Sequence, residues 1–154
     1  MSTVKFQNFS GIKNEQHTPR AIADVDVKNG YAVVVKYEDG VEKAFLPAGD
    51  EVKGDIYFVN NTITTPELDN KDDFVVKAGK PVRAFRYANS DAEIVEVSGD
   101  LVVTEDVKIG DILVANTDGK YAKTADASGY KVSLKVINYN TLGGKGYDCL
   151  IVVE

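Results

Sequence analysis

The stretch that most constrains the fold reads "EDVKIGDILVANTDGKYAKTAD", from Glu105 to Asp126. It has a near-copy in "DVKNGYAVVVKYEDGVEK", from Asp26 to Lys43. Both stretches contain Asp-Val-Lys-x-Gly, then an apolar run that favours β structure, then Asp-Gly with a lysine a few residues on. A weaker echo, "EVKGDIYFVNN", begins at Glu51. Repetition of such a phrase predicts two related β units, one in each half of the chain.

Each part of the repeated phrase has a structural task. The glycine after Asp-Val-Lys suits a turn into a strand, because glycine adopts positive φ angles without a steric penalty. The Asp-Gly pairs are typical of tight hairpin turns. The phrase contains no nucleophile, base or metal cage, so it predicts a building unit rather than a reaction centre. The residues predicted to form these turns are Gly30, Asp39, Gly40, Gly110, Asp118 and Gly119.

Strand signals follow one another from Ala21 onward. Residues 31–37 alternate, with Tyr31 and Tyr37 on one face. Residues 56–59 are apolar on both faces, which predicts a strand that is central or covered by a neighbour. Residues 74–87 predict two strands broken at Ala78-Gly79. The segment "AEIVEV" has capping-box spacing, but its β-branched residues favour a strand. About ten short strands with glycine-containing turns predict an all-β sandwich or barrel.

The first 20 residues lack sustained periodicity and predict an extended N-terminal arm, or alternatively a disordered leader. The rest, 21–154, predicts a β domain with halves at about 21–88 and 89–154. Apolar residues in the arm are spaced three apart, and polar ones near its end could hydrogen-bond a partner. The arm residues predicted to bind a partner are Phe6, Phe9, Ile12, His17 and Arg20.

Composition excludes several classes of protein. The chain has 154 residues, 44% of them hydrophobic, which is enough to form a hydrophobic core without disulfides or structural metal ions. A net charge of −6 argues against nucleic-acid binding. The single cysteine, Cys149, excludes an intrachain disulfide and fits a reducing compartment. The absence of a membrane-length apolar stretch and of a signal-peptide core predicts a cytosolic chain.

Motifs for chemistry are weak or absent. His17 and Cys149 lie in segments of different character, which predicts no metal site, no cofactor and no catalytic triad, and Cys149 reads as a small buried hydrophobe. The acidic run at 67–73 lacks the glycine and distal glutamate of a calcium loop. The glycine-rich run at 142–146 lacks phosphate-loop spacing. A biotinyl- or lipoyl-type carrier is disfavoured because no lysine at a hairpin tip is flanked by methionine.

The second half resembles the head decoration (capsid cement) proteins of tailed bacteriophages. That family carries a "V-x-x-G-D-x-V-x-x-D-G-x-x-x-x-A" phrase, then a strand, a small-residue loop and a terminal apolar strand. The resemblance covers about a third of the chain, and residues 26–44 show a weaker version of the same pattern. The matching positions are Val107, Gly110, Asp111, Val114, Asp118, Gly119 and Thr124-Ala125.

The resemblance implies a non-enzymatic protein on the exterior of a capsid, assembled in the bacterial cytoplasm. Its partner would be the major capsid protein, with contact partly through an N-terminal segment. Self-association, as a trimer or another homo-oligomer, is a further expectation, although the duplication departs from the smallest members. The alternative is another virion or cell-surface β module that binds a host surface or a carbohydrate. The absence of tryptophan argues against an aromatic surface on which a sugar ring would stack.

Overall fold

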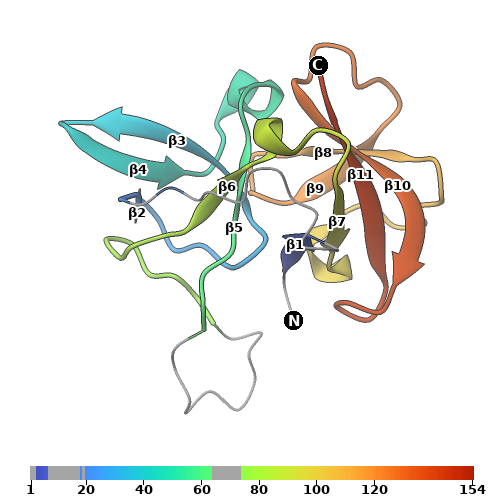
Figure 1. Ribbon diagram of the computed structural model, residues 1–154, viewed down its shortest axis with the longest axis horizontal. Helices are drawn as coiled ribbons and strands as arrows, with labels where there is room; N and C mark the ends of the chain where they lie inside the picture. Colours follow the sequence, from blue (N-terminus) through green and yellow to red (C-terminus); the bar gives the residue numbers. More distant parts are fainter. Residues whose placement is uncertain (1–2, 7–17, 19, 64–73) are drawn as a thin grey trace.

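The computed structural model describes residues 3–6, 18, 20–63 and 74–154, and within them the chain is all-β. Two sheets lie beside each other, one from each half of the sequence, except that the N-terminal strand β1 (Val4–Phe6) is an edge strand of the second sheet (Figure 1). The described helices are short 3₁₀ turns: η2 (Gly49–Lys53), η4 (Tyr87–Ser90) and η5 (Gly99–Leu101). The predicted all-β sandwich is therefore confirmed.

The first sheet has five strands in the order β2-β4-β3-β5-β6. β3 and β4 form an antiparallel hairpin, β5 pairs with β3, and β6 pairs with β5. β2 is parallel to β4. The central position predicted for the apolar segment at 56–59 is confirmed in β5. The strand bounds are Ile22–Ala23 (β2), Ala32–Glu38 (β3), Val41–Phe45 (β4), Tyr57–Val59 (β5) and Ala84–Arg86 (β6).

The second sheet has six strands in the order β1-β7-β11-β10-β8-β9, and every pairing within it is antiparallel. The longest pairing joins β10 and β11, with a bulge between Val136 and Asn138. The strand predicted for "AEIVEV" is confirmed as β7. The bounds are Val4–Phe6 (β1), Ile94–Val97 (β7), Ile112–Ala115 (β8), Tyr121–Thr124 (β9), Val132–Asn140 (β10) and Gly146–Val153 (β11).

Two predictions differ from the structure. Val4–Phe6 pair with Val95–Val97 of β7, so the beginning of the predicted arm is an edge strand of the second sheet. Val4 is fully buried, and burial of its side chain explains why this segment does not stay separate. Instead of a strand before Ala78, the structure has a single bridge between Val76 and Val27.

The main core lies between the two sheets. Side chains of both halves meet there, including Phe58 and Tyr87 from the first half and Leu134 and Ile151 from the second. A second core lies on the other face of the first sheet, where Val33 and Val59 pack under the segments around Val27 and Val82. The first sheet is thus covered on both faces, as the two-sided apolar pattern of β5 requires.

Candidate functional site

The repeated phrase forms the same turn in both halves. Gly30 has φ +88° and Gly110 has φ +96°, so both glycines occupy the left-handed region that the sequence predicted. Each turn is closed by a hydrogen bond from the residue after the glycine to the lysine carbonyl. These bonds join Tyr31 N to Lys28 O at 3.2 Å and Asp111 N to Lys108 O at 3.0 Å.

The same glycines also bond to the strand that follows each hairpin, which is β5 in the first half and β10 in the second. Gly30 N donates to Val59 O at 2.7 Å, and Gly110 N donates to Val136 O at 2.8 Å. Each valine returns a hydrogen bond to the residue after the glycine. The two turns are therefore equivalent in their long-range bonding as well as in their local shape.

Strand order extends the equivalence to whole halves. β3 and β4 form the first hairpin, β8 and β9 the second. In each half the following strand, β5 or β10, pairs with the first strand of the hairpin. In each half, chain that precedes the repeated phrase also pairs in parallel with the second strand of the hairpin. β2 pairs with β4, and Val102 forms a parallel bridge with Tyr121 of β9. The predicted equivalence of the hairpins is present in the topology; duplication as its origin stays a prediction.

The two hairpin tips differ in their surroundings. The tip of β8–β9 docks onto the first half, where Gly119 O accepts a hydrogen bond from Ala32 N at 2.6 Å. A Cβ added at Gly119 would lie 2.8 Å from Leu46 Cδ2 and 3.2 Å from Tyr31 Cδ2. A Cβ added at Gly40, in the tip of β3–β4, would have no neighbour within 4 Å.

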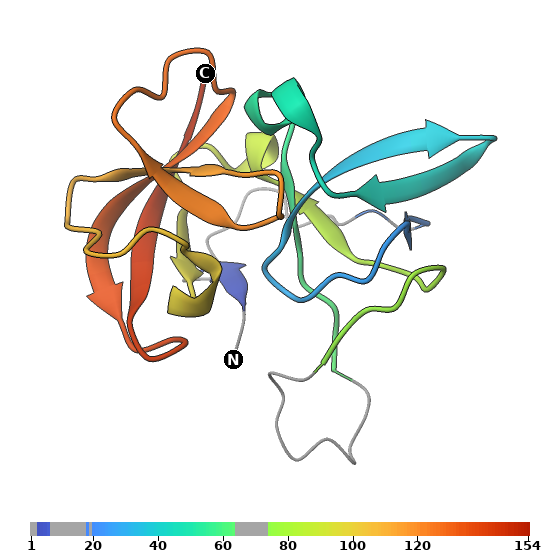
Figure 2. The same cartoon turned by 180° about the vertical axis from the view of Figure 1, so that it is seen from behind.

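The β3–β4 hairpin projects away from the body of the protein (Figures 1 and 2). Tyr37 is 76% exposed. The sequence predicts that Tyr37 shares a face with the partly buried Tyr31, and β3 continues beyond the core before it reaches Tyr37. Arg20, Tyr37, Gly40, Val41 and Glu42 line a hollow at this tip, which we call the hairpin surface.

One hydrogen bond orders the aromatic ring of the hairpin surface. The Tyr37 hydroxyl donates to Glu42 Oε2 at 3.0 Å across the strand pair. This hydrogen bond, and then the carboxylate charge, raise the pKa of the Tyr37 phenol. The ring is thereby held against β4, with most of its surface in water. The local sequence signal for this surface was the Asp39-Gly40 turn with charged residues on both sides of it.

The predicted partner-binding residues of the arm are not brought together within the described part of the chain. Phe6 lies in β1, opposite Val95. Phe9, Ile12 and His17 lie outside the described residues. Arg20 is exposed and belongs to the hairpin surface.

The predicted turn residues all occur in turns, but the two Asp-Gly pairs differ. Asp39 and Gly40 both have positive φ, 52° and 76°, as in a two-residue turn of type I′. In the second hairpin only Gly119 has positive φ, and Asn116 Oδ1 accepts hydrogen bonds from Asp118 N and Lys120 N. The second turn is therefore longer, and it places the Gly119 carbonyl against the first half.

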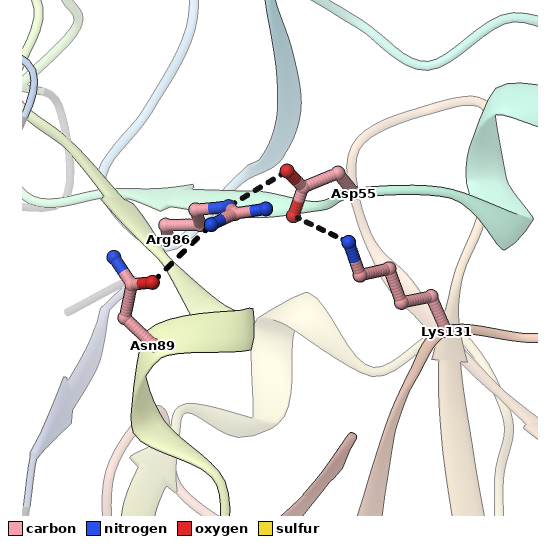
Figure 3. Close-up of polar contacts among 4 residues, drawn as sticks. All are labelled: Asp55, Arg86, Asn89 and Lys131. Atoms are coloured by element: carbon pink, nitrogen blue, oxygen red, sulfur yellow. Dashed lines mark hydrogen bonds and ion pairs between the residues drawn. The ribbon is translucent and has the colours of Figure 1, made fainter. Parts of the chain in front are cut away.

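A polar cluster links the two halves at their junction (Figure 3). Arg86 Nε donates to Asp55 Oδ2 at 2.7 Å, and its Nη1 donates to Asn89 Oδ1 at 3.3 Å. Lys131 Nζ, from the second half, lies 3.9 Å from Asp55 Oδ1. All the side chains of the ion pairs are partly exposed, so the cluster contributes modestly to stability and mainly orients the halves.

Two buried tyrosines meet in the main core. The hydroxyls of Tyr87 and Tyr121 lie 2.6 Å apart, and Tyr121 donates to Gly30 O at 3.3 Å. Burial raises the pKa of both phenols, so both stay neutral. Burial, followed by the nearby Asp148 charge, raises the pKa of Cys149 to about 12. Cys149 is fully buried, as predicted, and its thiol is unreactive near neutral pH.

Among the described residues, no group of three or more histidine, cysteine, aspartate or glutamate side chains is placed to hold a metal ion. No helix in the described part of the chain has the length and apolar character needed to cross a membrane.

Comparison with known proteins adds no relative: no family model, no curated protein and no solved structure matches the chain. The functional argument therefore depends on the sequence resemblance together with the geometry of the chain. That geometry is a pair of equivalent β units, one with a docked hairpin and one with a free hairpin.

Proposed function

We propose that the protein is a non-enzymatic structural protein of a phage virion, bound to the outside of the capsid. There it would stabilise contacts between major capsid subunits. The carrying observation is that the phrase resembling capsid decoration proteins folds as a turn and hairpin, and that the same unit recurs in the first half.

The residues that carry the resemblance have construction roles. Val107 and Val114 are buried, and Gly110 forms the turn. Asp111 accepts a hydrogen bond from Lys108 N at 2.8 Å and pairs with Lys123 at 3.0 Å. A unit whose characteristic residues all build a rigid hairpin suits a protein that acts by contact rather than by catalysis.

One observation favours the alternative of a host-surface or carbohydrate-binding module. An exposed aromatic ring beside a carboxylate and a guanidinium, as in Tyr37, Glu42 and Arg20, is a combination that can also hold a sugar. In that case soluble glycans would bind at the hairpin surface. Capsid shells would not bind the protein.

The test uses empty shells. We expect a major capsid gene beside the gene for this protein, and shells assembled from that capsid protein are mixed with the purified chain. Saturable co-sedimentation and a higher melting temperature of the shells are the expected results. Absence of saturable binding would overturn the proposal.

The predicted role of the arm needs point substitutions in the same assay. A truncation of residues 1–19 would also remove β1 and its fully buried Val4, so it would damage the fold. The double variant Phe9→Ser, Ile12→Ser keeps β1. If the arm contributes to the anchor, this variant binds shells more weakly than the unchanged protein.

A further inference from the structure

The β3–β4 hairpin is longer than the fold needs. β3 has seven residues and β4 has five, whereas β8 and β9 have four each. The first three residues of β3 are buried and the last three are exposed. An isolated two-stranded ribbon in water is marginally stable. The added length therefore contributes little to the core, and a contact outside the chain is its simplest use.

Local interactions hold this extension in one shape. Lys36 pairs with Glu51 of η2 at 2.9 Å, and its ammonium group also lies 4.8 Å from the centre of the Phe45 ring. Lys43 pairs with Glu38 at 3.1 Å. A pre-ordered contact element loses little conformational entropy on binding.

The second hairpin also has an Asp-Gly pair at its tip, in a longer turn, and it shows how such a glycine is received. Its glycine carbonyl accepts one backbone N–H, from Ala32 at the start of a strand, and its bare Cα lies against Leu46 and Tyr31. The receiving site is thus a small cup formed by two apolar side chains and the Ala32 backbone, whose N–H bonds to the tip. The glycine fits because any side chain at this position would meet the wall of the cup.

We propose that the tip of the β3–β4 hairpin is the contact element toward the partner, and that the partner offers a similar cup. Gly40 would enter it, with Tyr37 and Val41 packing on its rim and Arg20 beside them. This inference rests on the proposed function, and it names the occupant as the major capsid subunit. The partner chemistry is an apolar depression with an unpaired backbone N–H at a strand end.

The first experiment is a matched pair of glycine substitutions. Gly40→Asn introduces a residue that also tolerates positive φ, and it adds a side chain at the tip. Gly129→Asn is the control, since Gly129 has φ +84° and also has open space around it. We expect Gly40→Asn to bind shells at least tenfold more weakly than Gly129→Asn, with equal melting temperatures for the two variants.

The outcomes separate the two proposals. If the unchanged protein binds shells and Gly40→Asn binds them equally well, the hairpin contact is overturned and the capsid function stands. If the unchanged protein does not bind shells, both are overturned. The unchanged protein could instead fail to bind shells but form a dimer that Gly40→Asn abolishes. That result would identify a second copy of the chain as the occupant and overturn its assignment to the capsid subunit.

A labelling experiment tests the same contact without relying on lost affinity. Cys149 is fully buried, so a cysteine introduced by Asp39→Cys is the one that a maleimide reaches in the described fold. Shell binding should slow its labelling at least tenfold. A cysteine introduced by Ser128→Cys, in the other half, should label at an unchanged rate. Equal rates at position 39 with and without bound shells would overturn the inference.

Discussion

Asn29 and Ile109 occupy the same position of the repeated phrase, one residue before the glycine of the turn. Asn29 is 7% exposed and exchanges two hydrogen bonds with Asn61, whereas Ile109 is 57% exposed. The backbone of the two turns is alike, yet one turn is enclosed by neighbouring chain and the other faces water. Identical turn chemistry therefore determines local shape, while the segments packed around it determine burial and the cost of substitution.

The largest expected effect contrasts Gly30→Ala with Gly110→Ala. Both substitutions introduce a side chain at positive φ, at a cost of about 1 to 2 kcal/mol. At Gly30 the new Cβ would also collide with Leu101 Cδ1 and lie 3.0 Å from Val4 N. At Gly110 it would meet nothing within 4 Å.

We therefore expect Gly30→Ala to lower the free energy of unfolding by about 3 to 4 kcal/mol and Gly110→Ala by about 1 to 2 kcal/mol. Urea unfolding of the two variants measures both losses. Equal losses would show that the two turns do not differ in their packing.

A smaller difference in stability is expected when Asn29 and Ile109 are each replaced by the residue found at the other position. Asn29→Ile leaves Asn61 N and O without their partners, at an expected cost of about 2 to 3 kcal/mol in the free energy of unfolding. Ile109→Asn changes an exposed side chain and should stay within about 0.5 kcal/mol of the unchanged protein. Thermal unfolding with calorimetry gives both values, and a larger loss for Ile109→Asn would contradict the comparison.

The smallest expected effect concerns two carboxylates, the exposed Asp26 in the first half and the partly buried Asp111 in the second. The pKa of Asp111 is lowered below 3.8, first by the hydrogen bond from Lys108 N and then by that from Lys123. The pKa of Asp26 is lowered likewise, first by Ala78 N and then by Lys77. Because folding lowers both values, their stabilisation is present above pH 3.8 and is lost as the pH falls through the lowered pKa.

Carbon-detected NMR titration of the carboxyl groups measures both pKa values. Lys123→Gln should raise the pKa of Asp111 toward 3.8 and leave that of Asp26 unchanged, and Lys77→Gln should do the reverse. A shift of both carboxyls by either substitution would show that the net charge, and not the local pair, lowers them.

Local features of the fold could be predicted from sequence, because turn chemistry and strand periodicity depend on neighbouring residues. The left-handed glycines at Gly30 and Gly110, the central strand around Phe58 and the buried Cys149 all follow from such patterns. η4 lies between the last strand of the first sheet and β7, and the division of the chain near residue 88 stays a prediction.

The contacts that distinguish the two halves could not be predicted in this way. Alternation placed Tyr37 on the same face as Tyr31, but no short-range pattern tells where the core ends along β3. The docking of Gly119 on Ala32 joins residues far apart in sequence, and the capture of Val4 beside β7 does so too. The candidate site depends on these differences, so the sequence predicted the turn of the hairpin surface but not its exposure.

The position of β1 has a consequence for how the chain is made. Thr3 N bonds to Ser98 Oγ at 2.9 Å, and the two residues are 95 positions apart. On a ribosome that adds about 5 to 20 residues per second, Val4 leaves the exit tunnel roughly 5 to 20 seconds before its partner strand leaves it. The first sheet can form during that interval, but the edge that receives β1 cannot. We expect folding intermediates to carry an unplaced N-terminus, and final closure to follow synthesis of the second half.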